Sequence, residues 1–293
     1  MKLLYKSTCY IFKFKNTVYQ NYYLYCKLKT LLTLYRNHMI ILKYLLAGIF
    51  GALCGSFLNV VIYRLPISLK TETPSGFNLI KPRSHCPQCK HIISWWQNIP
   101  ILSFIILRGR CKNCTGKINL RYPIVEIISS AATIYILFLF GSNHVDFSAK
   151  IIFTYSLIAL FFIDLENFIL PDEITLGLMW SGLIVSVINN CNIITPREAI
   201  LGAISGYLSL WLIEKTFKLI RGKNGMGNGD FKLFAALGAW LGFTKLPLII
   251  FLAAFTGSVL GIILIISKKL SYNQSIPFGP FLAVFSWLVM IFM

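Results

Sequence analysis

Apolar runs recur along the chain from residue 44 onward, and short polar connections separate them. Several runs approach the roughly 20 residues that a helix needs to cross a bilayer. The first, Tyr44 to Tyr63, carries Gly48, Gly51 and Gly55 at a spacing that lets another helix approach closely, and it is expected to end at Arg64-Leu65-Pro66. Further spans are expected at 123–140, 149–164, 173–189, 198–217, 231–243, 246–266 and 277–293. The pattern predicts an all-α polytopic membrane protein with about eight transmembrane helices.

Composition indicates which class of protein contains these helices, and charge indicates which connecting loops face the cytoplasm. The chain has 293 residues, of which 56% are hydrophobic, and a mean hydropathy of +0.69, which excludes soluble, secreted and disordered classes. The net charge of +18 comes from Lys and Arg between apolar runs, which is typical of cytoplasmic loops rather than of nucleic-acid binding. Arg64 to Arg121 holds ten basic residues against one acid, so this loop is expected to be cytoplasmic. Its apolar middle, Ile99 to Leu107, is too short to span and is expected to pack in the loop domain or lie on the membrane.

These observations divide the chain into four expected parts. Residues 1–43 form a basic N-terminal extension, either a poorly ordered arm or an interfacial helix, with Met39 as an alternative translation start. Residues 44–63 are the first span, 64–122 a cytoplasmic tetracysteine loop domain, and 123–293 a seven-helix membrane domain. Counting spans places both chain ends outside.

Four of the eight cysteines form two CxxC pairs with 21 residues between them: Cys86, Cys89, Cys111 and Cys114. Four thiolates hold a tetrahedral Zn²⁺ in a closed structural site, and the spacing is close to the two-knuckle zinc pattern. Disulfides and a redox pair are alternatives, but a cytoplasmic loop is reducing. His85 and His91 lie beside the first pair and are further possible ligands.

Two aspartates interrupt apolar helices at the same expected depth. Asp164 closes the third span and Asp230 opens the sixth, 66 positions later, both on the cytoplasmic side. An ionisable residue at such a place is a functional candidate, and two carboxyls that share a proton can activate water to attack a peptide bond. Helix capping explains Asp172 after Pro171 well, but it does not explain Asp164, because the helix dipole disfavours an anion at a helix end.

Two further acidic positions are singled out by their surroundings. Gly225, Gly227 and Gly229 precede Asp230, and their conformational freedom is expected to bend the chain so that Asp230 faces Asp164. Glu126 lies one turn into a predicted span and is expected to pair with a loop Arg or Lys. The glycine run lacks the βαβ context of a dinucleotide site.

Taken together, these motifs resemble those of the type IV prepilin peptidases, the bifunctional prepilin leader peptidase/N-methyltransferases. The resemblance covers nearly all of 44–293 in the family's order. It rests on the segments GSFLNVVIYRLP (55–66), the four cysteines, RYP with Glu126 (121–126), Asp164 with LPD (170–172), GMGNGDFK (225–232) and IPFGP (276–280).

The resemblance implies a GxGD-type aspartic protease of the inner membrane with Asp164 and Asp230 as catalytic residues, and makes 123–293 its peptidase domain. It implies cleavage after a glycine of the basic leader of type IV prepilins and of the pseudopilins of type II secretion. It also implies methylation of the new amino terminus, usually phenylalanine, with S-adenosylmethionine as the donor and the zinc-binding cysteine loop as part of the bifunctional form.

Two alternatives stay open at this stage. One is a zinc-stabilised membrane scaffold or transporter, with the two aspartates as an ion or proton site. The other is a peptidase whose methyltransferase half has decayed.

Overall fold

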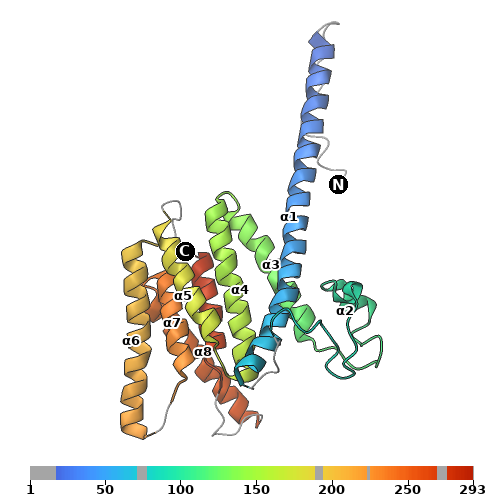
Figure 1. Cartoon of the computed structure of the whole chain (residues 1–293). Helices are drawn as coiled ribbons and strands as arrows, with labels where there is room; N and C mark the ends of the chain where they lie inside the picture. Colours follow the sequence, from blue (N-terminus) through green and yellow to red (C-terminus); the bar gives the residue numbers. More distant parts are fainter. Residues whose placement is uncertain (1–17, 71–77, 189–193, 223–224, 269–275, 293) are drawn as a thin grey trace. The chain divides into compact units, whose positions relative to one another are not determined.

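The computed structural model describes residues 18–70, 78–188, 194–222, 225–268 and 276–292, and the regular elements in these ranges are helices (Figure 1). They are α1 (Val18–Lys70), the 3₁₀ helix η1 (Trp95–Asn98), α2 (Leu102–Ile106), α3 (Arg121–Phe140), α4 (His144–Asn167), α5 (Asp172–Val187), α6 (Pro196–Arg221), α7 (Asn228–Leu241), α8 (Leu246–Ile266) and α9 (Gly279–Phe292). The expected all-α architecture is confirmed.

The chain divides into two compact units, Met1–Leu46 and Ala47–Met293. The first unit contains the beginning of α1, and the first 17 residues of the basic extension lie outside the described residues. Every contact described below belongs to the second unit.

In the part of the chain that the structure describes, four helices are long and apolar enough to cross a membrane: Leu32–Leu69 within α1, Arg121–Phe140, His144–Asn167 and Leu246–Ile266. α9 is apolar but shorter. Helices also occupy the other three expected ranges, as α5, α6 and α7. The membrane character is therefore supported, whereas eight complete spans stay a prediction.

The small residues of α1 face α3, as their spacing predicted. A Cβ added to Gly51 would lie 2.5 Å from Thr133 Oγ1, and one added to Gly55 would lie 2.8 Å from the Cα of Glu126. The Ser130 hydroxyl donates to the Gly48 carbonyl over 2.9 Å. Only glycine permits this approach, so the expected close helix contact is confirmed.

The prediction that α1 ends at Arg64-Leu65-Pro66 was wrong, because the helix continues to Lys70 with Pro66 inside it. A proline removes one backbone hydrogen bond, which a well-packed helix can tolerate. Arg64 is 7% exposed and binds the following loop, donating to the carbonyls of Asn78 (2.9 Å) and Pro82 (2.6 Å). These hydrogen bonds hold the segment before the cysteines against the last turns of α1.

α7 is enclosed by other helices, packing against α5, α6, α8 and α9. Apart from Lys232, its residues from Asp230 to Leu241 are all buried. Its contact with α6 is backbone to backbone, because a Cβ on Gly202 would lie 2.1 Å from the Gly238 carbonyl oxygen. The helix that begins beside Asp230 is thus fixed by its protein neighbours.

Candidate active site

Asp164 lies in the last turn of α4 and is 5% exposed. Its Oδ2 accepts the backbone N–H of Gly279, the first residue of α9, over 3.0 Å. A Cβ on Gly279 would lie 2.6 Å from the same oxygen, so a larger residue would push the carboxylate away. Unpaired N–H groups at a helix start stabilise an anion, and α9 therefore supplies the favourable dipole that α4 denies to Asp164.

Asp230 lies in the first turn of α7 and is 8% exposed. Its Oδ2 accepts the N–H of Gly227 over 3.3 Å, which is a capping interaction. Its Oδ1 is buried and has no hydrogen-bond partner among the described residues. Buried polar atoms normally have partners, so capping accounts for only half of this side chain.

Leu170 connects the surroundings of the two aspartates. A Cβ on Gly229 would lie 2.8 Å from the Cβ of Leu170, and one on Gly279 would lie 3.2 Å from its Cδ2. The charges of Asp164 and Asp230 are close enough to interact. The structure therefore brings together the two carboxyls that the membrane topology predicted to lie at one depth.

The glycines before Asp230 serve close approach rather than an unusual backbone conformation. The positive-φ glycines of the described chain are Gly109, Gly222 and Gly242, so the expectation that Gly225, Gly227 and Gly229 use special dihedral freedom was wrong. A side chain on Gly229 would meet Leu170. The small residues let this segment lie tightly against Leu170, in the connection after α4, and against Phe217 of α6.

Glu214 of α6 holds the start of this loop. Its carboxylate accepts the N–H of Gly225 over 3.1 Å and that of Met226 over 3.0 Å. Hydrogen bonds to a charged acceptor are stronger than neutral ones. Glu214 thus positions the segment that carries Asp230.

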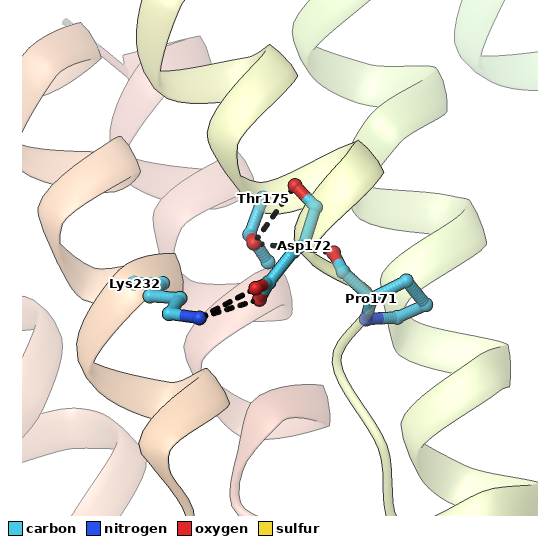
Figure 2. A network of polar contacts seen from close by, with 4 residues as sticks. All are labelled: Pro171, Asp172, Thr175 and Lys232. Carbon is cyan, nitrogen blue, oxygen red and sulfur yellow. Dashed lines mark hydrogen bonds and ion pairs between the residues drawn. The ribbon is translucent and has the colours of Figure 1, made fainter. Parts of the chain in front are cut away.

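Asp172 does not cap α5 as predicted, because Pro171 occupies the capping position and Asp172 is the first helical residue. Figure 2 shows its carboxylate facing Lys232 of α7, with Nζ–O distances of 2.7 and 2.6 Å. The Thr175 hydroxyl in the same network donates to the Pro171 carbonyl over 3.1 Å. Asp172 therefore ties α5 to α7 beside Asp230.

Glu126 makes hydrogen bonds where an ion pair with a loop Arg or Lys was expected. Its Oε2 accepts the N–H of Ile101 over 2.7 Å, and the side chain also bonds Ser56. Ile101 has φ 62°, a costly conformation for a β-branched residue, and the buried Glu126 helps to hold it. Arg121, the nearest basic residue to Glu126 in the sequence, pairs with Glu166.

The four loop cysteines form one cluster, with their Sγ atoms within 4.8 Å of one another. The Sγ atoms of Cys86 and Cys114 lie 3.9 Å apart. In a tetrahedral site with Zn–S bonds of about 2.3 Å, sulfur atoms lie about 3.8 Å apart, so the cluster fits zinc. His85 and His91 are outside the group that lies within ligand distance.

Both CxxC pairs have the same backbone geometry. The carbonyl of Cys86 accepts from Lys90 N–H, and that of Cys111 accepts from Thr115 N–H. Lys90 and Thr115 both have positive φ, at 55° and 57°. Two matching turns that present four sulfurs to one point are typical of a structural zinc site.

The turns also favour thiolates. Backbone N–H groups of Cys114 and Asn113 lower the pKa of Cys111 to about 7. Although the Gly116 N–H favours its thiolate, the neighbouring sulfurs of Cys111 and Cys89 raise the pKa of Cys114 to about 11. A divalent cation would remove this mutual repulsion.

The sequence analysis missed Glu214 and gave Gly279 no role, although Gly279 lay within a quoted motif. Gly279 acts through its backbone N–H, which has no side-chain signature. Glu214 had a weak signal, because it is one of ten acids in an acid-poor chain.

Known protein families and relatives match most of the chain. The model of the bacterial peptidase A24 N-terminal domain matches residues 49–140, and that of the type IV leader peptidase family matches residues 151–262. A prepilin leader peptidase/N-methyltransferase of Aeromonas hydrophila is 40% identical over 266 residues, covering 85% of this chain and 91% of its own. Enzymes of the same description from Neisseria gonorrhoeae and Legionella pneumophila are 42% and 41% identical, covering 83% and 82% of this chain and 88% of each relative. No solved structure matches.

Proposed function

The chain belongs to the type IV leader peptidase family, and from that premise we propose that it is a membrane aspartic endopeptidase with Asp164 and Asp230 as its catalytic residues. It removes the basic leader of type IV prepilins and pseudopilins and then methylates the new amino terminus. The observation that carries this assignment is the buried Oδ1 of Asp230, which has no hydrogen-bond partner among the described residues, on a side chain within electrostatic range of Asp164.

The two carboxyls divide the work of an aspartic protease. Asp164, whose Oδ2 accepts the Gly279 N–H, is the better stabilised anion and serves as the base that deprotonates water. Asp230 carries the shared proton on its unpartnered Oδ1 and donates it to the scissile carbonyl. As the tetrahedral intermediate collapses and the C–N bond breaks, Asp164 gives the proton that it took from water to the leaving amine, and a hydroxyl of the intermediate returns a proton to Asp230.

The position of the dyad suits a substrate that enters from the cytoplasm. Asp164 lies at the end of α4 and Asp230 at the start of α7, on the side that the basic loops make cytoplasmic. A prepilin has a basic leader followed by an apolar helix, so its scissile bond lies at this interface. We place the protein in the inner membrane, with eight helices and its active site at the cytoplasmic face.

Little negative charge is left to attract the leader. Glu166 is engaged by Arg121, and Asp172 by Lys232. Glu173 is exposed in the first turn of α5. It is the best candidate for contact with a leader Lys or Arg.

The two cofactors follow from the cysteine cluster and from methyl transfer. Zn²⁺ would be held by Cys86, Cys89, Cys111 and Cys114 and would fix the fold of the loop. S-adenosylmethionine supplies an activated methyl group when bound. Of the four parts 1–43, 44–63, 64–122 and 123–293, we assign the loop domain 64–122 to methyl transfer and the membrane domain 123–293 to proteolysis.

One experiment tests both activities. The purified full-length protein is incubated in lipid with a prepilin and methyl-labelled S-adenosylmethionine, and the product is analysed by mass spectrometry. We expect a shortened pilin with one added methyl group at its amino terminus. Uncleaved prepilin would refute the proposal, and cleavage without label would indicate a decayed methyltransferase half.

The scaffold or transporter alternative is not favoured. Its central feature, a pair of intramembrane acids, is equally present in a peptidase. The curated relatives that span most of the chain carry enzyme names.

A further inference from the structure

A cavity of about 660 Å³ lies between the second half of α1, the cysteine loop and the start of α3. Its volume falls within the range of about 300–1,000 Å³ that is usual for small-molecule sites. The aspartate dyad does not line it. The cavity is therefore a second site with its own ligand chemistry.

Two residues that line the cavity each carry a buried polar atom that has no partner among the described residues. One is Oδ1 of Asn59, a residue 2% exposed whose Nδ2 donates to the Tyr122 carbonyl over 3.0 Å. The other is Nε of Arg121, a residue 8% exposed whose Nη1 pairs with Glu166. Buried groups of this kind are normally satisfied, so the cavity calls for a ligand that offers a donor to Asn59 and an acceptor to Arg121.

The remaining walls narrow the ligand class. Aromatic rings of Tyr63, Trp96 and Tyr122 line the cavity and are suited to stacking on a planar heterocycle. The lining also carries charge of both signs, from the carboxylates of Glu126 and Glu166 and from the basic side chains of Arg64, Lys112, Lys117 and Arg121. S-adenosylmethionine carries all the groups that these side chains would bind. Its ammonium group suits Asn59 and its carboxylate suits Arg121. It also has a planar heterocycle, adenine, and a second positive charge on its sulfonium sulfur.

We propose that this cavity binds S-adenosylmethionine, with Asn59 and Arg121 holding its amino-acid end and the aromatic residues its adenine ring. This proposal rests on the proposed methyltransferase function and locates its donor-binding site in the cavity. The cysteine cluster forms part of the wall through Cys86 and Cys111, which explains why a structural metal would matter for methyl transfer.

The end of α4 contributes one residue to the cavity and one to the aspartate dyad. Asp164 points toward Gly279, whereas Glu166, two residues later, lines the cavity and pairs with Arg121. Residues two positions apart lie on opposite sides of a helix about 10–12 Å wide. The newly released amine thus has about one helix diameter to move between cleavage and methylation.

The transfer is balanced without an additional reactant. The lone pair of the neutral amine attacks the methyl carbon, and the methyl–sulfur bond breaks with its electron pair going to sulfur. The positive charge passes from sulfur to nitrogen. The methylated ammonium later releases its proton to water.

Equilibrium binding of labelled S-adenosylmethionine to the full-length protein in lipid tests the site, with and without prepilin. Asn59→Leu removes the acceptor at nearly constant shape, and Arg121→Lys keeps a positive charge for Glu166 but lacks Nε. Each variant is expected to bind at least about tenfold more weakly, as for loss of a hydrogen bond to a charged group. Asn59→Asp keeps an acceptor and is expected to bind better than Asn59→Leu.

The controls separate this proposal from the proposed function. Arg197→Lys, exposed on α6, is expected to bind like the parent protein. Asp164→Asn is expected to keep binding while it loses cleavage, because Asp164 is outside the cavity. Size-exclusion profiles and zinc content identify any variant that fails to fold.

Photocrosslinking of the labelled donor, followed by peptide mapping, gives a readout that does not depend on variants. Label is expected in peptides containing residues 56–64 or 94–123. Methylation by a parent protein whose label lies in α5–α9, or whose binding is unchanged in Asn59→Leu and Arg121→Lys, would overturn the cavity assignment alone. A parent protein that cleaves prepilin but binds no donor would overturn the methyl-transfer function as well.

Discussion

The backbone N–H of Gly279 donates to Oδ2 of Asp164 over 3.0 Å, across 115 positions of sequence. The contact joins the end of α4 to the start of α9 and orients one carboxylate of the proposed dyad. It depends on the absence of a side chain, because a Cβ on Gly279 would lie 2.6 Å from the same oxygen.

Gly279→Ala is therefore expected to displace Asp164 and to slow leader cleavage by about 10- to 100-fold, as small misplacements of catalytic groups do. The measurement is the rate of prepilin cleavage by purified protein. Gly177→Ala on α5 is the matched control, because nothing lies within 4 Å of the added Cβ. It is expected to leave the rate intact, and equal rates in both variants would show that the Gly279 contact does not position Asp164.

Asp164→Asn and Asp230→Asn are each expected to reduce cleavage by about 10²- to 10⁴-fold, because neither amide can exchange the shared proton. Asp172→Asn is the matched control, since Asp172 is partly exposed and paired with Lys232. It should cost at most about 1 kcal/mol of stability and leave cleavage near the parent rate. Retained processing by either dyad variant would remove that residue from the catalytic pair.

Glu214→Ala is expected to free the N–H groups of Gly225 and Met226 and to loosen the loop before Asp230. Losing hydrogen bonds to a charged group costs about 1.5–3 kcal/mol, so cleavage should fall by about tenfold or more. Glu214→Gln keeps an acceptor and should lose less. Glu198→Ala, which removes a cap at the other end of α6, tests whether general weakening of α6 has the same effect.

Cys111→Ser is expected to lower the zinc content from about one ion per chain, because a structural site needs its four ligands. We expect methylation to be lost while cleavage is retained, since the dyad lies outside the cysteine loop. Metal content is measured by elemental analysis and both reactions by mass spectrometry. Cys54→Ser on α1, outside the cluster, is the control, and a parent protein without zinc would refute the metal assignment.

The helices were predictable because the physical signal is strong and local. Leu246–Ile266 begins and ends as expected, since Lys245 and Ser267 flank a largely apolar run that contains no charged residue. The end of α1 was misplaced because Pro66 is a local signal for a break, whereas Arg64 makes distant hydrogen bonds that the sequence does not display. Tertiary contacts overruled local preference there.

The candidate site was predictable only where charge made it conspicuous. Asp164 and Asp230 are costly in an apolar setting, so their positions alone marked them. The partners that orient them are backbone groups and one distant acid, which carry no such mark. The roles of two other acids were assigned wrongly. Glu126 bonds Ile101 where an ion pair was expected, and Asp172 binds Lys232 where a helix cap was expected.

α7 has only 14 residues, which as a helix extends about 21 Å, less than the roughly 30 Å of a bilayer's hydrocarbon core. Nearly every side chain on it is covered by protein, so lipid has almost no surface there on which to act. The depth of Asp230 is consequently set by α5, α6 and α9 rather than by hydrophobic matching. The rate of cleavage should therefore vary little with bilayer thickness. The enzyme would then keep its activity when the lipid composition of the membrane changes.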